Sequence, residues 1–277
     1  MHICHLHIKT MAIITLISDW HQGDHYLAAL KGKLLSLMPG LNIVDICHQL
    51  SPFGFIKAGF MLRNSYRSFP KGTVHIISIN SEATPDSPHI VVYHEGHYFI
   101  GADNGIFGII FPDKPEKAFL LEHSSNSVFP EYDVFADAAV YLSSQGDINN
   151  LGAPYHELNI PSQLRATFDQ STIIGSVIYI DSYSNAITNV TRDIFEKAGK
   201  SRRFEILLKT NYYKINKINS FYHETSNGEL LALFNSANLL EIAVAKGNAA
   251  ELLNLGVNDT IRIKFYDTPE REELKLK

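Results

Sequence analysis

Two short polar segments contain residues whose types and spacing suit ligand binding. Asp19 follows an apolar run and precedes a stretch with helical periodicity. Open α/β sheets bind ligands where their strands end, and a carboxylate there can accept hydrogen bonds from a vicinal diol. The second segment is the turn Asp181-Ser182-Tyr183-Ser184-Asn185. Its carboxylate could hold an ammonium group by charge-assisted hydrogen bonding while the asparagine orients polar groups.

Both segments also have an interpretation that needs no ligand. Asp19 could be a loop residue or a helix cap, and residues 181–185 could form a β-turn that is complete in itself. The residue types alone leave the two interpretations open.

The first ten residues, MHICHLHIKT, contain four side chains that could bind a soft metal: His2, Cys4, His5 and His7. The packed protein is expected to begin near Met11, where a strand-like apolar run starts. Because chain ends order poorly unless they are tied down, we expect residues 1–10 to be a disordered or non-native start. We predict no metal site and no cofactor.

Composition narrows the class of protein. The 277 residues are 45% hydrophobic and 19% charged, which suits one large globular domain or two unequal ones. The net charge of -5, without a block of Lys or Arg, provides no electrostatic footprint for nucleic acid or an anionic membrane. No apolar stretch reaches the roughly 20 residues that span a bilayer. With only two cysteines, the chain is expected to be cytoplasmic.

Residues 11–160 have the pattern of an α/β domain. Short apolar runs alternate with helical periodicity, which predicts strands at 13–17, 43–46 and 74–79 and helices at 55–68 and 132–143. The nearly continuous apolar run 74–79 is typical of a strand covered on both faces, so we predict a mostly parallel sheet. Residues 90–100 predict a hairpin.

Residues 171–267 predict a smaller, mainly antiparallel β-barrel domain, after a linker at 161–170. Apolar runs separated by turn signals predict strands over most of this region, and one short helix is expected at about 249–255.

Five segments together resemble the S-adenosylmethionine (SAM) hydroxide adenosyltransferase family, whose superfamily includes the SAM-dependent chlorinase and fluorinase. They are SDWHQGDHYLAALKG (18–32), NIVDICHQLSPF (42–53), FPKGTVHIISI (69–79), IDSYSNAITNV (180–190) and LFNSANLLEIAVAKGNAA (233–250). The resemblance implies an N-terminal α/β domain, a C-terminal β-barrel, and SAM as substrate or ligand. It also implies a homotrimer in which SAM lies between one subunit's first domain and its neighbour's second.

The resemblance assigns ligand contacts in the first domain. The residue matching Asp19 binds the ribose hydroxyls. Trp20 stands where phenylalanine is usual, and it packs either on the sugar or adenine or within the core. Asn80 is a third candidate contact.

In the second domain, the turn resembles a D-x-F-G-N motif that holds the methionine ammonium, with Asp181, Tyr183 and Asn185 as candidate contacts. Ser184 stands where the motif has a glycine, and a glycine at that position indicates a special backbone angle. Asn235 and Ser236 match family residues that contact the amino-acid end of the ligand. The backbone from Val244 to Lys246 matches the segment that contacts the adenine edge. A barrel strand with its turn would explain this last segment without a ligand.

The family's hydrolases are understood to use Asp, Arg and His to prepare water for attack on the ribose C5′. The aspartate of their V-D-P-G-V-G loop is replaced here by Asn80, in Ile79-Asn80-Ser81-Glu82-Ala83-Thr84. The arginine position falls at Ser87. The histidine of their F-H-G-R-D segment falls at Pro130, in Phe129-Pro130-Glu131-Tyr132-Asp133. All three roles are vacant, and loss of a general base costs about 10²- to 10⁴-fold in rate.

Five nearby side chains could replace the base: Glu82, Asp86, His89, Glu131 and Asp133. Glu82 is preferred because its loop carries the family's aspartate. Three functions stay open: a SAM hydrolase with a rearranged proton acceptor, a non-catalytic SAM- or adenosine-binding module, and a halide adenosyltransferase. A halide needs no deprotonation, so the vacancies do not exclude the third.

Overall fold

The computed structural model describes residues 12–52, 54–111, 113–121, 127–160, 165–208 and 213–267. The chain divides into two compact units, with the division between positions 161 and 162. The side chains of the first ten residues that we considered as metal ligands lie outside the described residues.

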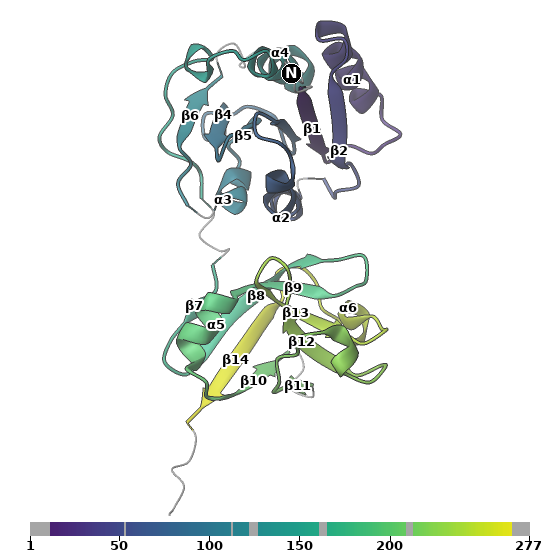
Figure 1. The fold of residues 1–277 in the computed structure, drawn as a ribbon, viewed down its shortest axis with the longest axis vertical. Helices are drawn as coiled ribbons and strands as arrows, with labels where there is room; N and C mark the ends of the chain where they lie inside the picture. The colour runs from purple at the N-terminus through teal and green to yellow at the C-terminus, as the bar shows by residue number, and fades with distance from the viewer. Residues whose placement is uncertain are drawn as a thin grey trace, which may run out of the picture. The chain divides into compact units, whose positions relative to one another are not determined.

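The first unit is built on a six-stranded sheet with the order β2-β1-β3-β5-β4-β6 (Figure 1). The strands are β1 (Ile13–Ser18), β2 (Asn42–Cys47), β3 (Val74–Ser78), β4 (His89–His94), β5 (His97–Ala102) and β6 (Lys117–Leu120). β1 pairs in parallel with β2 and β3, and β3 pairs in parallel with β5. β4 runs antiparallel to β5 and β6, so the sheet is mixed and mostly parallel, as predicted. The predicted hairpin is β4–β5.

Helices cover both faces of this sheet (Figure 1). One face carries α1 (His25–Leu37) and α4 (Ala136–Ser143), and the other carries α2 (Phe55–Ser65) and α3 (Ile106–Ile110). All five residues of β3 are buried, as its apolar run predicts. The covered faces leave the carboxyl ends of the strands as the place where polar side chains can gather.

Three local features depart from the expected pattern. The first helix of the 55–68 segment ends at Ser65 and continues as a 3-10 turn, Tyr66–Ser68. The segment expected as a helix at 132–143 begins as a π-helical turn, η3 (Glu131–Phe135), before α4. The sequence analysis did not predict α3 and β6, which are five and four residues long.

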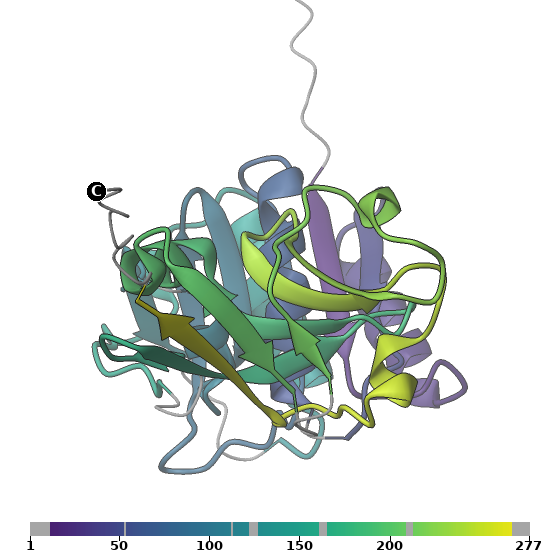
Figure 2. The same ribbon diagram turned by 90° about the horizontal axis from the view of Figure 1, so that it is seen from below.

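The second unit is an antiparallel, nearly closed, barrel-like sheet, as predicted (Figure 2). Its strands, labelled in Figure 1, have the order β11-β10-β14-β8-β9-β13-β12. Its strands are β7 (Thr167–Phe168), β8 (Thr172–Ile180), β9 (Ala186–Thr191), β10 (Arg203–Leu207), β11 (Lys214–Ile215), β12 (Leu230–Phe234), β13 (Leu239–Val244) and β14 (Thr260–Tyr266). The amide of Asn219 donates to the Ala232 carbonyl at 2.7 Å, which brings the stretch after β11 against β12. β7 lies within the stretch expected to be a linker and pairs with β8.

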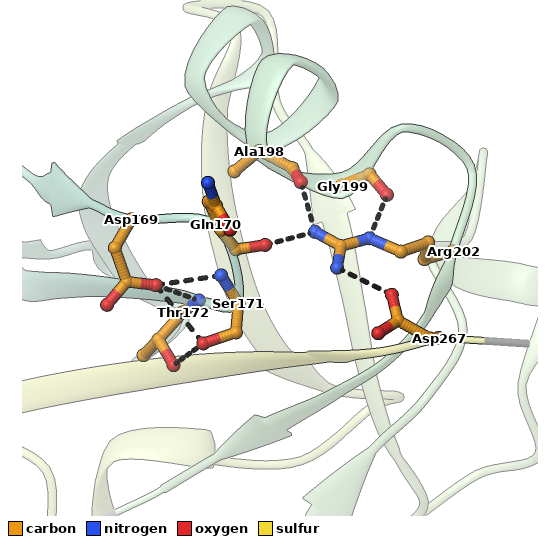
Figure 3. A network of polar contacts seen from close by, with 8 residues as sticks. All are labelled: Asp169, Gln170, Ser171, Thr172, Ala198, Gly199, Arg202 and Asp267. Atoms are coloured by element: carbon orange, nitrogen blue, oxygen red, sulfur yellow. Dashed lines mark hydrogen bonds and ion pairs between the residues drawn. The ribbon is translucent and has the colours of Figure 1, made fainter.

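Two short helices accompany this sheet: α5 (Arg192–Gly199) and α6 (Ala249–Leu252). α5 was not predicted, although Thr191 is a capping residue whose hydroxyl accepts from the Ile194 amide at 3.2 Å. Its end is held by Arg202, which donates to the carbonyls of Ala198, Gly199 and Gln170 and pairs with Asp267 at 3.2 Å (Figure 3). These contacts join the helix to the turn before β8, so Arg202 has a structural role.

Candidate functional site

Asp19 and Asn80 lie at the carboxyl ends of two adjacent parallel strands, β1 and β3. The Asp19 amide donates to the Ser78 carbonyl at 3.2 Å. The Asn80 amide donates to Oδ2 of Asp19 at 3.3 Å. The half-buried Asp19 carboxylate therefore sits at the ligand-binding edge expected from its place after a strand.

The backbone of Asn80 has a φ of 43°, in the left-handed region that asparagine tolerates better than most residues. Asn104, which follows β5, holds this turn in place. Its Nδ2 donates to the carbonyls of Ile79 at 2.7 Å and Asn80 at 3.2 Å. Asn104 was missed in the sequence, where its segment Asp103-Asn104-Gly105 carries only a turn signal.

Ser81 and Glu131 contact each other at the same edge. The Ser81 hydroxyl donates to Oε1 of Glu131, which begins η3 and is 2% exposed. Burial raises the pKa of this carboxyl, and the nearby charge of Asp19 raises the pKa further, whereas the Ser81 hydrogen bond lowers it. The Ser81 carbonyl accepts from Nε2 of His89 at 2.6 Å.

The resemblance matched the family's reactive positions to Asn80, Ser87 and Pro130, and none of these three side chains is a base. The amide and carbonyl of Ser87 pair with Thr84 at 3.1 and 3.2 Å in a tight turn. Pro130 is buried at the start of η3. Glu82, the substitute we preferred, is exposed, and its carboxylate accepts no hydrogen bond from the described residues.

Trp20 belongs to an aromatic cluster beside Asp19. Its ring lies 5.8 Å from that of Tyr26 and 5.6 Å, edge to face, from that of Phe129. Phe129 in turn stacks on Tyr132 at 5.7 Å. Trp20 is half-buried and packs against the core of its unit.

A group in the first unit has the geometry of a Ser-His-Asp triad, but a substrate cannot reach its serine. It consists of Ser18, His48 and Asp45. The Ser18 hydroxyl lies 2.6 Å from Nδ1 of His48, whose Nε2 lies 3.2 Å from Asp45. Ser18 is 1% exposed and His48 is 2% exposed, so no substrate carbonyl can reach the hydroxyl. Burial lowers the pKa of His48. The group anchors the strand end that carries Asp19.

In the second unit, the Asp181 carboxylate organises its own turn. Oδ1 accepts from the amides of Tyr183 at 2.9 Å and Asn185 at 2.8 Å, and Oδ2 accepts from Nδ2 of Asn185 at 3.1 Å. Ser184 has a φ of 61°, the special backbone angle expected where the family motif has glycine. Asn185 is buried, whereas Tyr183 is 78% exposed.

A second carboxylate of this unit, Glu241, is buried among neutral donors. It accepts from the Tyr222 hydroxyl at 2.7 Å and from Nδ2 of Asn235 at 3.1 Å. Burial, the Glu241 hydrogen bond and the charges of Glu241 and Asp181 all raise the pKa of Tyr222. The two carboxylates therefore make this region negative, which favours a cationic ligand group. Sequence reasoning missed Glu241 and Tyr222, which lie in different segments.

The remaining candidates lie on or beside β13. Oδ1 of Asn235 accepts from the amides of Ala237 at 3.0 Å and Leu239 at 3.3 Å, so its side chain shapes the turn before β13. Ser236 is exposed. Val244 ends the strand, and Lys246, with a φ of 51°, follows in a turn closed by the Gly247 amide.

The described part of the chain contains no group of three or more His, Cys, Asp or Glu side chains that could hold a metal ion. Nor does any of its helices have the length and apolar character needed to cross a membrane.

Comparison with protein families identifies the chain's relatives. The family model of the SAM hydroxide adenosyltransferase N-terminal domain matches residues 14–152, and that of the C-terminal domain matches residues 175–262. The chain belongs to this family. Asp19, Asn80, Ser87 and Pro130 lie within the first match, and the Asp181 turn and Asn235 lie within the second.

Curated relatives of the chain include hydrolases and fluorinases. The chain is 29% identical over 266 residues to an (R)-S-adenosyl-L-methionine hydrolase of Methanocaldococcus jannaschii, covering 91% of this chain and 96% of that protein. It is 22% identical over 289 residues to a fluorinase of an Actinoplanes species, covering 91% and 97%. A crystal structure of an uncharacterised conserved protein from Thermotoga maritima matches with a TM-score of 0.79 and 25% identity, over 91% of this chain and 99% of that one.

Proposed function

We propose that the protein binds SAM and transfers its adenosyl group to water, giving adenosine and methionine. The observation that carries this proposal is the Asp19 carboxylate at the joined ends of β1 and β3, in a chain whose relatives include SAM hydrolases. Asp19 accepts hydrogen bonds from the ribose diol, and Trp20 and Asn80 line the same edge. The sulfonium already provides a good leaving group, so the protein must align water and remove its proton.

In the second unit, Asp181 binds the methionine ammonium. The negative surroundings created by Asp181 and Glu241 support this assignment, and the rigid turn presents Tyr183 and Asn185 in one geometry. Asn235 and Ser236 contact the amino-acid end, and the backbone from Val244 to Lys246 contacts the adenine.

The protein is proposed to be a cytoplasmic homotrimer whose sites lie between subunits, as the family resemblance implies. Light scattering of the purified protein tests the trimer: a monomer at concentrations that bind ligand contradicts it.

A second candidate function is a non-catalytic module that binds SAM or adenosine. Its support is the loss of all three reactive side chains at Asn80, Ser87 and Pro130. Halide adenosyl transfer is the third candidate, supported by the fluorinases among the relatives.

One experiment separates the three functions. The protein is incubated with SAM, with and without chloride, and nucleosides are detected by mass, while calorimetric titration measures binding of SAM and adenosine. Adenosine that accumulates without halide supports hydrolysis. Halide-dependent 5′-halo-adenosine supports the third function, and tight binding without any product supports the binding module. Absence of binding contradicts all three.

A further inference from the structure

The contact between Ser81 and Glu131 joins the two loops in which the family's reactive residues are missing. Ser81 directly follows Asn80, and Glu131 directly follows Pro130. In the family patterns quoted above, the positions of Ser81 and Glu131 hold proline and glycine. Neither of those residues has a side chain that could make this hydrogen bond, so the pair is a feature of this chain's own site.

Burial determines which member of the pair can meet a ligand. Glu131 is 2% exposed, whereas Ser81 is only half-buried. The Ser81 hydroxyl donates its proton to Oε1 of Glu131 and so leaves its oxygen lone pairs able to accept another hydrogen bond. A molecule at the carboxyl edge therefore reaches Glu131 through Ser81.

The charge of Asp19 adds to burial in raising the pKa of Glu131. On α1, Lys33 pairs with Asp137 of α4 at 3.2 Å. On β3, His75 lies 2.7 Å from the hydroxyl of Thr15, and at the start of β4 His89 donates to the Ser81 carbonyl. A carboxylate with a raised pKa is a stronger base than an ordinary glutamate at neutral pH.

We propose that Ser81 and Glu131 form the proton path of the hydrolytic reaction, with the Ser81 hydroxyl in contact with the attacking water. Water attacks C5′, and the electrons of the breaking C5′–S bond go to sulfur, which leaves as the neutral thioether of methionine. The water proton passes to Oγ of Ser81 while the Ser81 proton passes to Oε1 of Glu131. Glu131 releases this proton to solvent after the products leave. The proposal rests on the proposed hydrolytic function.

The test compares the parent protein with Glu131→Gln and Ser81→Ala. Adenosine release from saturating SAM gives kcat across a range of pH, and calorimetric titration gives the SAM dissociation constant. Both variants are expected to lose about 10²- to 10⁴-fold in kcat while the dissociation constant changes by less than about threefold. The parent kcat should fall as pH drops through the raised pKa of Glu131, and this acid limb should be absent from the residual rate of Glu131→Gln.

Asp137→Asn is the matched control, since it makes the same kind of change at an exposed carboxylate of the adjoining helix α4. It should keep the parent kcat and pH profile. If Glu131→Gln fails to fold, as judged by thermal unfolding, Ser81→Ala carries the test alone.

Each outcome has one meaning. Variants that keep the parent kcat, or a Glu131→Gln variant whose acid limb is unmoved, overturn the proton path alone. A parent protein that binds SAM but releases no adenosine overturns the proton path and the hydrolytic function together.

Discussion

The backbone amide of Asn80 donates a hydrogen bond to Oδ2 of Asp19 at 3.3 Å, which ties the ends of two adjacent parallel strands through one carboxylate. In the proposed function the same carboxylate accepts from the ribose diol. Strand geometry and ligand affinity are therefore coupled at Asp19, and a substitution there must be chosen to separate them.

Asp19→Asn makes this separation, because its amide oxygen can still accept from Asn80 while its NH₂ group cannot accept from a hydroxyl. Hydrogen bonds to charged groups contribute about 1.5–3 kcal/mol, so affinity for adenosine and SAM should fall about 10- to 100-fold. Calorimetric titration measures this change, and an unaltered urea midpoint shows that the strand ends are intact. Adenosine bound as tightly as by the parent would remove Asp19 from the ribose site.

Asp181→Asn should distinguish the two ligands, since SAM carries an ammonium group and adenosine does not. The variant keeps an oxygen for the amides of Tyr183 and Asn185, but it loses the charge and the oxygen that accepts from Nδ2 of Asn185. We expect SAM affinity to fall about tenfold or more, with adenosine affinity unchanged. Asp169→Asn is a matched control, because Asp169 likewise accepts from the amides of Ser171 at 2.7 Å and Thr172 at 2.8 Å (Figure 3). Equal losses for both ligands would make Asp181 purely structural.

Substitutions at Ser184 test the left-handed backbone of the same turn. A φ of 61° costs a non-glycine residue roughly 1–2 kcal/mol. Glycine avoids this cost, but its larger entropy in the unfolded chain cancels part of the gain. Ser184→Gly should raise the free energy of unfolding by up to about 1 kcal/mol, and the β-branched Ser184→Val should lower it by about 1–2 kcal/mol. Urea unfolding monitors both, with Ser182→Gly as the control at a position without positive φ. Destabilisation by glycine would contradict the assigned conformation.

His75 should make stability depend on pH. It is fully buried beside Thr15 and His97, and burial, followed by the His97 charge, lowers the pKa of His75 to about 3. In the unfolded chain the His75 side chain binds a proton below about pH 6.5, whereas in the folded chain it stays neutral until a much lower pH. The contribution of His75 to stability is therefore greatest above about pH 6.5. It should fall as pH drops from 6.5 toward 3, by at most about 1.4 kcal/mol per pH unit from this histidine.

Urea unfolding at a series of pH values checks this dependence. His75→Asn should have a shallower decline than the parent between pH 6.5 and 4.5, whereas a change at the exposed His223 should leave the slope unaltered. Equal slopes for the parent and His75→Asn would exclude His75 as the source.

The sequence by itself determined the class of fold and the place of Asp19 in it. The apolar run at 74–79 predicted a strand buried on both faces, and the position of Asp19 after a strand placed it at the carboxyl edge. The resemblance, which has a glycine at the position of Ser184, indicated a special backbone angle there, and Ser184 has a φ of 61°. These features depend on periodicity and on local backbone preferences, which neighbouring residues set.

The tertiary structure alone decided which polar side chains meet. Ser81 and Glu131 are 50 positions apart, and Tyr222 and Glu241 are 19 apart, in segments without a shared period. The sequence favoured Glu82 over Glu131 as the substitute base, yet Glu82 is exposed while Glu131 is buried. Such pairs depend on how loops pack at a sheet edge, where burial and hydrogen-bond geometry rather than spacing select the partners.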